Sequence, residues 1–292
     1  MPKVSIVKDT NIREKTRKSI ELIGGMEQFI EKGETVFVKP NLIYPAPPPL
    51  TTHPEVTGAI VEMCFEAGAG KVLVGEGGAP VPKKTDNFSV RETFKVTGTQ
   101  DIVESLGAEM VCLDEEDYVV VEVPNGVIYQ QVKLYRSIAE CDKRIGVPVL
   151  KTHYDTDVSL GIKGWHGVIA DAEKFWKFHR DDINQKLVDL ARVIDPALTV
   201  IDGTVGMEGL GPLGGTSINM DLILASSDTV SVDTVAAQVM GFDPMMVDHI
   251  RIGNMQGLGT ADMNQIEVVG DSIESVKKNF EKPDIRLTAM YD

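Results

Sequence analysis

The side chains best suited to chemistry are concentrated in residues 147–180. This stretch holds three of the five histidines of the chain, His153, His166 and His179. It also holds Lys151 and Lys163. It does so although the chain as a whole has a net charge of −15. Because functional side chains tend to gather on loops at strand ends, we interpret this stretch as the functional centre. The alternative is a solvated connection with ordinary polar side chains.

The first pattern in this stretch is an alternation of one histidine and two acids. His153, Asp155 and Asp157 would lie on one side of an extended chain. Their nitrogen and oxygen atoms are ligands that divalent metals accept. Many such runs simply face water. The pattern is therefore compatible with a metal site or with a solvated strand.

The second pattern is Lys163-Gly164-Trp165-His166-Gly167. Glycines beside a lysine and a histidine leave backbone room for a ligand, and Trp165 offers a stacking face. A lysine in such a pocket acts as a base, forms a covalent link or binds an anion. The alternative is that Lys163 reaches solvent and Trp165 belongs to the core.

Further candidates stand at the ends of predicted strands. They are Lys39 after strand 35–38, Glu76 at the end of strand 71–76, and Asp202 after strand 198–201. Two further acids, Asp228 and Asp233, belong to the predicted helix 228–240. Asp228 suits its N-terminal cap, and Asp233 suits an inward-facing hydrogen-bond acceptor.

The segment 206–215 is rich in glycine, and Gly209, Gly211 and Gly214 formally match the dinucleotide pattern GxGxxG. That fingerprint needs a strand directly before it and a helix directly after it. Here the predicted strand ends upstream, Pro212 interrupts the pattern and a strand follows, so we reject dinucleotide binding. A glycine-lined wall over a ligand and a plain mobile loop both remain.

The elements that would position these residues alternate between strands and helices. We predict strands at 4–7, 35–38, 71–76, 108–113, 118–123, 143–150, 198–201, 221–225 and 266–269, and helices at 12–31, 54–67, 89–106, 182–194, 228–240 and 245–255. The first three strands are nearly continuous apolar runs, typical of a parallel sheet covered on both faces. We therefore expect one α/β domain over 1–292, mostly parallel and Rossmann-like, with helices on both faces and a glycine-rich loop insertion. Ligands bind such sheets beyond the carboxyl ends of the strands.

Three interruptions are expected within this pattern. Gly24-Gly25 weakens the first helix, and Gly98 breaks the helix over 89–106. Pro124-Asn125-Gly126 is a turn signal, so we expect a hairpin around it.

Composition excludes several classes of protein. A net charge of −15 argues against a general nucleic-acid surface or an anionic membrane surface, because both need basic patches. Three scattered cysteines fit a reducing compartment and exclude a self-contained four-cysteine iron–sulfur site. The first residues are no signal peptide, and no apolar run reaches membrane-spanning length. We expect a soluble cytoplasmic protein.

Several longer motifs resemble the domain-of-unknown-function family 362. They are VFVKPNL at 36–42, HPEV at 53–56, VGEG at 74–77, PVLKTH at 148–153, GIKG at 161–164, VIDGTVGMEGLGP at 200–212 and LASSDTVSVDTVAAQVMG at 224–241. Many members of that family are joined to ferredoxin-like domains with two iron–sulfur clusters. We expect no such domain within residues 1–292, so the resemblance implies that a redox role would need a separate iron–sulfur partner.

The order of elements is also similar, more distantly, to the nickel-pincer lactate racemase superfamily. That resemblance implies a catalytic His153, a Lys163 that holds the pincer cofactor covalently, and a nickel ligand at His179. In the loop after the third strand, where a second catalytic histidine is expected, this chain has Glu76-Gly77-Gly78. Glu76 would then replace that base, or the reaction differs.

The first hypothesis is an enzyme with racemase- or isomerase-like acid–base chemistry on a small hydroxy- or oxo-acid. Its catalytic residues would be His153, Glu76 and Lys151; its cofactor-binding residues Lys39, Lys163, Gly164, Trp165, Gly209 and Gly211; and its metal ligands His166, His179 and Asp202. The cofactor would be nickel or another divalent metal, or a lysine-linked pincer-type group. The alternatives are a redox or cofactor-delivery accessory of an iron–sulfur partner, and a plain small-molecule binding module.

Overall fold

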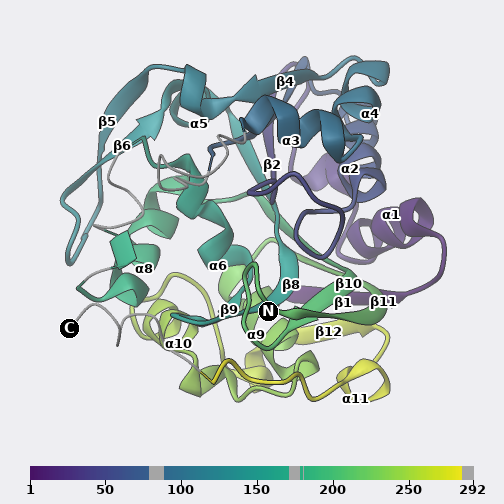
Figure 1. The fold of residues 1–292 in the computed structure, drawn as a ribbon, viewed down its shortest axis with the longest axis vertical. Helices are drawn as coiled ribbons and strands as arrows, with labels where there is room; N and C mark the ends of the chain where they lie inside the picture. Colours follow the sequence, from purple (N-terminus) through teal and green to yellow (C-terminus); the bar gives the residue numbers. More distant parts are fainter. Residues whose placement is uncertain (79–88, 171–177, 180, 285–292) are drawn as a thin grey trace.

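The computed structural model describes residues 1–78, 89–170, 178–179 and 181–284. Within these residues a ten-stranded sheet forms the centre of the fold (Figure 1). Its strands are β1 (Lys3–Lys8), β2 (Thr35–Pro40), β3 (Lys71–Glu76), β4 (Glu109–Cys112), β7 (Lys143–Val147), β8 (Val149–His153), β9 (Asp157–Ser159), β10 (Leu198–Glu208), β11 (Thr216–Ser226) and β12 (Glu267–Gly270). The order is β12-β1-β11-β10-β7-β2-β3-β4, and β8 pairs with β10 and β9.

Most neighbouring strands of this sheet run in the same direction. Strands β10, β7, β2, β3 and β4 are parallel, as are β1 and β12, whereas β11 and β9 run against their neighbours. The first strand of the chain, β1, lies between β11 and β12, which come from the last third of the chain. The predicted α/β fold with a mostly parallel sheet is confirmed.

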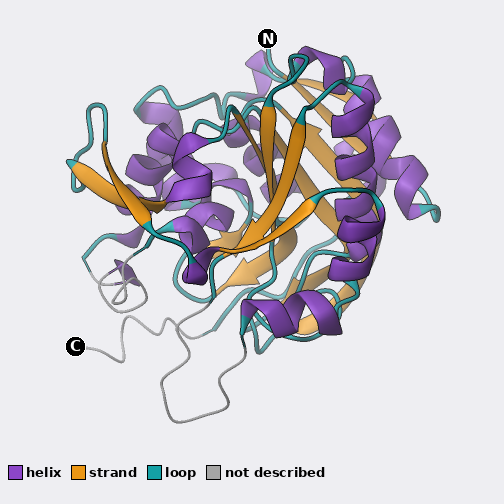
Figure 2. Ribbon diagram, turned by 90° about the horizontal axis from the view of Figure 1, so that it is seen from above, coloured by secondary structure: helices purple, strands orange, loops and turns teal. Residues whose placement is uncertain are grey.

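Helices cover both faces of the sheet (Figure 2). One face carries α1 (Ile12–Leu22), α2 (Pro54–Glu66), α3 (Val90–Val96) and α4 (Thr99–Ser105), and the other carries α5 (Arg136–Glu140), α6 (Gly161–Gly164), α8 (Ile183–Ile194), α9 (Thr229–Val239), α10 (Asp248–Met255) and α11 (Ile273–Val276). The strands supply both cores because their side chains alternate. Val36 and Val38 belong to the first core and Phe37 to the second. In the part of the chain that the structure describes, no helix has the length and apolarity to span a bilayer.

The helix boundaries follow capping side chains and glycines. Asn11 accepts a hydrogen bond from the backbone of Glu14, and Asp228 caps α9 as predicted. The first helix is shorter than predicted. It ends at Leu22 because Gly24 and Gly25 both adopt positive φ, which glycine alone tolerates easily.

Two strand predictions are wrong in their boundaries. The run 143–150 is two strands, β7 and β8, because Pro148 has no backbone N–H to donate and the chain shifts there to new partners. The strand at 198–201 continues to Glu208, and the next one begins at Thr216. The glycine-rich insertion thus shrinks to the connection 209–215 of a long hairpin.

A two-stranded arm, β5 (Tyr118–Glu122) with β6 (Gln131–Tyr135), extends from the main body (Figure 1). It confirms the predicted hairpin. Its connection is held by the buried carboxylate of Asp189 on α8, which accepts hydrogen bonds from the backbone N–H groups of Val127, Ile128 and Tyr129. One acid therefore fastens the arm to the helical layer.

Asp189→Ala should lower the free energy of unfolding by about 2–4 kcal/mol, because three backbone donors lose their buried acceptor. Urea denaturation followed by circular dichroism measures this loss. Asp284→Ala, at an exposed position, is the matched control and should leave the midpoint unchanged. Equal midpoints for both variants would contradict the anchoring role of Asp189.

Candidate functional site

A buried ion pair joins the ends of two neighbouring parallel strands. Lys39 lies at the end of β2 and Glu76 at the end of β3, and Lys39 Nζ is 2.7 Å from Glu76 Oε2. Both side chains are buried, with exposed fractions of 3% and 0%. Glu76 also accepts hydrogen bonds from the backbone N–H groups of Leu42 and Gly77. The expectation that strand ends bring these two residues together is met.

Gly167 packs directly on this ion pair. It lies in the short helical turn Trp165–Val168, and a Cβ atom at this position would collide with Glu76 Oε1 and press on the Lys39 side chain. Only glycine lets the backbone come so close. The contact brings the 161–168 segment against the ends of β2 and β3.

Lys151 and His153 lie on the same face of β8, two residues apart. The chain then reverses, and His153 stands opposite Asp157 in the antiparallel β8–β9 pair. The idea of one extended run over His153, Asp155 and Asp157 is therefore wrong. A tight turn with positive φ at Asp157 replaces it, and the pairing places the first and last residues side by side.

Lys151 is an isolated amine in the interior. Its exposed fraction is 1%, and Nζ has no hydrogen-bond partner among the described residues. Burial, together with the positive charges of Lys163 and Lys39, lowers the pKa of Lys151 to about 7, and the carboxylate of Glu76 opposes this shift. A large part of the Lys151 population is thus a neutral amine at pH 7.

Lys163 approaches the same place from α6. It is buried, and burial lowers its pKa to about 8, with the carboxylate of Asp155 opposing the shift. The start of α6 is fixed by Asp233 of α9, which accepts hydrogen bonds from the N–H groups of Gly161 at 2.7 Å and Ile162 at 2.9 Å. The expectation that Asp233 is an inward-facing acceptor is met, and burial raises its pKa to about 7.

His153 has a defined tautomer. The backbone N–H of Asp155 donates to His153 Nδ1 at 3.1 Å, so the neutral ring carries its proton on Nε2. Burial lowers the pKa of His153 well below its usual value, and the charges of Lys163, His179, Lys151 and His166 act in the same direction. The ring is therefore neutral at pH 7 and offers an N–H donor.

The other two histidines of the stretch converge on His153. The rings of His153 and His179 are stacked with centroids 6.2 Å apart, and His166 meets His179 edge-on at 5.2 Å. His179 Nε2 lies 3.9 Å from Asp155 Oδ2. No three His, Cys, Asp or Glu side chains among the described residues are placed to hold one metal ion. The metal role of His166 and His179 stays a prediction.

Asp202 lies elsewhere than expected. It sits within β10 rather than at its end. Its carboxylate accepts hydrogen bonds from the backbone of His53 at 2.7 Å and of Thr204 at 2.9 Å. These contacts tie Asp202 to the start of α2. Its metal role likewise stays a prediction.

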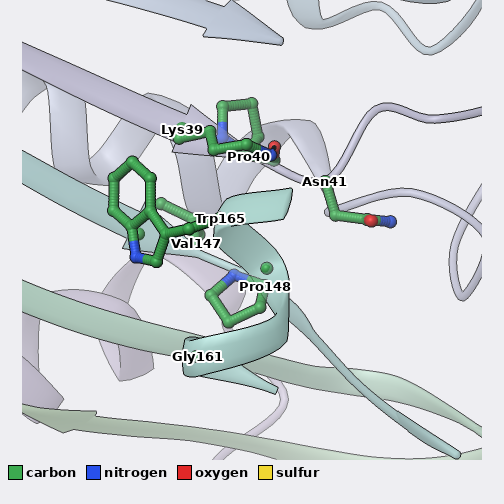
Figure 3. Close-up of a pocket in the computed structure, with 9 residues that line it drawn as sticks. Lys39, Pro40, Asn41, Val147, Pro148, Gly161 and Trp165 are labelled. Carbon is green, nitrogen blue, oxygen red and sulfur yellow. Dashed lines mark hydrogen bonds between the residues drawn. The ribbon is translucent and has the colours of Figure 1, made fainter. Parts of the chain in front are cut away.

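Trp165 belongs to the core, which was the alternative interpretation. Its ring packs on Gly146, Gly164 packs on Pro148, and the indole is 1% exposed. The ring borders a hollow of about 10 Å³, roughly the room one water needs. Figure 3 shows Lys39 and Pro40 on one side of this hollow and Pro148 with Gly161 on the other. The described part of the site is therefore tight.

The glycines of the 209–215 connection approach protein rather than open space. A Cβ on Gly211 would collide with the backbone oxygen of Thr152, and Thr152 Oγ1 donates to the carbonyl oxygen of Gly209 at 2.8 Å. The connection therefore supports β8 from the face opposite Lys151 and His153. A cofactor-binding role of Gly209 and Gly211 stays a prediction.

One buried residue near the site escaped sequence analysis. His249 of α10 is fully buried, its Nδ1 lies 3.3 Å from Asn184 Oδ1, and burial together with the charge of Lys163 lowers its pKa to about 3. A single histidine in a helix gives no distinguishing signal. Only the packing of α10 beside α8 reveals it.

Comparison with known proteins identifies the family. Residues 36–238 match the family model described as Domain of unknown function (DUF362). The chain belongs to this family. The thylakoid-associated protein sll1697 of Synechocystis sp. (strain ATCC 27184 / PCC 6803 / Kazusa) is 26% identical over 279 residues, which cover 93% of this chain and 83% of that protein. The resemblance inferred from the motifs is confirmed.

Two solved structures share lower similarity with this DUF362 chain. The lactate racemase apoprotein from Thermoanaerobacterium thermosaccharolyticum has a TM-score of 0.49 and 14% identity, with 80% of this chain and 56% of that chain covered. A Thermotoga maritima protein has a TM-score of 0.38 and 12% identity, with 75% and 55% covered. This chain thus spans a little over half the length of each.

Lys151→Met should stabilise the protein at pH 6 by on the order of 3 to 5 kcal/mol, an advantage that shrinks toward pH 10. The folded pKa of about 7 lies below the ordinary 10.5. Below pH 7 both states hold the proton and the burial penalty is full. Between pH 7 and 10.5 only the unfolded state holds it, so the stability of the wild type rises with pH. Denaturation at several pH values, with exposed Lys277→Met as control, measures this; a pH-independent difference would contradict it.

Proposed function

We propose that this protein is an enzyme that binds a small hydroxy- or oxo-acid at the ends of β2, β3 and β8 and performs acid–base chemistry on it. The observation that carries the proposal is the buried, unpartnered amine of Lys151 on the same strand face as the neutral ring of His153. Perturbed titratable groups gathered at strand ends are typical of catalytic sites.

The acidic substrate is supported by the charges around the site. Lys39, Lys151 and Lys163 face two carboxylates, Glu76 and Asp155. Glu76 is engaged by Lys39 and two backbone donors, so it holds the cluster together and is poorly placed to act as a base. In the chain without an attached cofactor, Lys163, whose pKa of about 8 keeps it mostly protonated at pH 7, would pair with a substrate carboxylate.

In this proposal the base is a lysine, and the histidine acts as a hydrogen-bond donor. Lys151, with a pKa of about 7, offers a lone pair at neutral pH and would accept the substrate proton. His153 holds its proton on Nε2 and would donate a hydrogen bond to the substrate oxygen as negative charge develops there. Asp233 has an indirect role, because its hydrogen bonds to the backbone of Gly161 and Ile162 orient the helical turn that carries Lys163.

The cofactor follows from the same residues. A metal held by protein side chains alone does not fit the described residues, because no three ligands converge there. A group attached through Lys163 fits better, because a buried amine with a lowered pKa is a suitable nucleophile for a covalent link. When bound, a pincer-type group carrying nickel would supply an electrophilic metal centre. Intact mass and metal analysis of protein from its native host test this: added mass on Lys163 with one metal supports it, and an unmodified Lys163 overturns it.

The proposed setting is one α/β domain in a reducing, cytoplasmic compartment. Cys64, Cys112 and Cys141 are buried free thiols, as expected for such a compartment. The proposed partners are the small-molecule substrate and, for the accessory alternative, a separate iron–sulfur protein.

The wild-type chain should exchange the methyl hydrogens of pyruvate for deuterium in D2O, because Lys151 accepts a proton while His153 stabilises the enolate oxygen. His153→Ala and Lys151→Met should each slow the exchange by about 100-fold or more. Proton NMR follows the loss of the methyl signal. Exposed Lys277→Met should match the wild type.

Interconversion of D- and L-lactate by protein from the native host is the second readout of this function. Absence of both exchange and lactate interconversion in folded wild-type protein would overturn the proposed function. A wild-type rate in His153→Ala would remove His153 from its role.

A further inference from the structure

We propose that Lys151 is a covalent residue that forms an imine with the carbonyl carbon of a small 2-oxo acid. This inference rests on the proposed function and names the substrate class of the same site. In the proposed function the lone pair of Lys151 accepts a proton; in this inference the same lone pair attacks the carbonyl carbon of a 2-oxo acid.

The three buried lysines differ in what engages their amines. Lys39 Nζ donates to Glu76 and to the carbonyl oxygen of Pro40. The negative charge of the Asp155 carboxylate stabilises the protonated form of Lys163. Lys151 Nζ has no acceptor among the described residues, and an ammonium group buried without an acceptor is costly. The surroundings therefore favour the neutral, nucleophilic form of Lys151, as a second lysine nearby does in imine-forming enzymes.

The charge balance selects an acid as the carbonyl compound. A protonated imine on Lys151 adds one positive charge to an interior that already holds Lys39 and Lys163. The carboxylate of a 2-oxo acid brings one negative charge with it, so the adduct as a whole is neutral. A simple ketone would leave a buried, uncompensated cation, which costs free energy.

The packed backbone beside the three lysines favours a small acid. Gly167 lies against Glu76 and Gly164 against Pro148, so a Cβ atom at either position would press on its neighbour. We therefore take pyruvate, one of the smallest 2-oxo acids, as the probe.

The chemical step needs no further reactant. The neutral Nζ attacks the carbonyl carbon, and the electron pair of the C=O double bond moves to oxygen, which the Nε2–H of His153 stabilises. Nitrogen loses its protons as oxygen gains them, water leaves, and the C=N bond forms. Amine plus oxo acid thus gives imine plus one water, and one proton taken up from solvent gives the protonated imine, with no change in oxidation state.

Trapping with cyanoborohydride tests the inference on the full chain. Wild-type protein is incubated at pH 7 with pyruvate and the reductant, and peptides are mapped by mass. We expect a reduced adduct on Lys151 whose added mass is that of pyruvate less one oxygen atom. Because an ordinary lysine is almost entirely protonated at pH 7, Lys151 should carry roughly 100-fold more adduct than exposed Lys277.

Two controls make the result specific. Lys151→Met, folded by circular dichroism, should lose the adduct, whereas Lys277→Met should keep it. Acetone, which has the same carbonyl without the carboxylate, should label Lys151 at least ~10-fold less than pyruvate, as expected for an uncompensated cation. Equal labelling by acetone would overturn the choice of an acid. An adduct on Lys163, an adduct spread evenly over exposed lysines, or no adduct would overturn the role of Lys151.

Failure of this inference is distinguishable from failure of the proposed function. Methyl exchange of pyruvate without any trapped adduct leaves acid–base catalysis standing and removes the imine. A trapped adduct on Lys151 without exchange or lactate interconversion supports the imine and removes the proton-transfer function.

Discussion

The buried ion pair of Lys39 and Glu76 is the constraint on which the site depends. Removing two charges from water costs several kcal/mol per ion, and their attraction repays this only when further hydrogen bonds complete the pair. Glu76 is completed by two backbone N–H groups and Lys39 by a carbonyl oxygen. The backbone at Leu42 and Gly77 is thereby fixed, and Gly167 must stay a glycine to pack on the pair. The ion pair therefore fixes the ends of β2 and β3, the position of the 161–168 segment and the electrostatic potential around them.

That potential explains how one small region accommodates three lysines. Among the described residues, Lys39 alone of the three has a carboxylate partner at hydrogen-bond distance. The other two, Lys151 and Lys163, reduce the cost of burial by releasing their protons more easily, with pKa values of about 7 and 8. Burial keeps His153 neutral, and the positive charges of Lys163, His179 and Lys151 in their protonated forms act in the same direction. The reactivity that we propose for these amines follows from burial, because the interior favours the uncharged amine, which has the lone pair that a base or nucleophile needs.

Much of the fold could be read from the sequence, because alternating apolar strands and capped helices are local signals. The motifs also placed Lys39, Glu76, Lys151 and His153 at strand ends, where the structure brings the first two into contact. What failed depends on contacts between distant segments. Asp202 seemed to end a strand because Gly203 follows it, yet pairing with β11 carries the strand onward. The role of Asp189 in fastening the β5–β6 arm and the burial of Trp165 likewise depend on how the helices pack. The spacing of residues along the sequence does not encode that packing.

The position of β1 has a consequence for how the chain is made. This strand leaves the ribosome before its two partners, β11 and β12, which follow roughly 200 residues or more later. At ordinary rates of translation that interval is about 10–40 s. Throughout it, the apolar residues of β1 have no sheet to join, while β2 and β3 can already pair with each other. Translation pauses before residue 216 would thus lengthen the exposure of this first strand, and a chaperone that holds extended apolar segments would be most useful then.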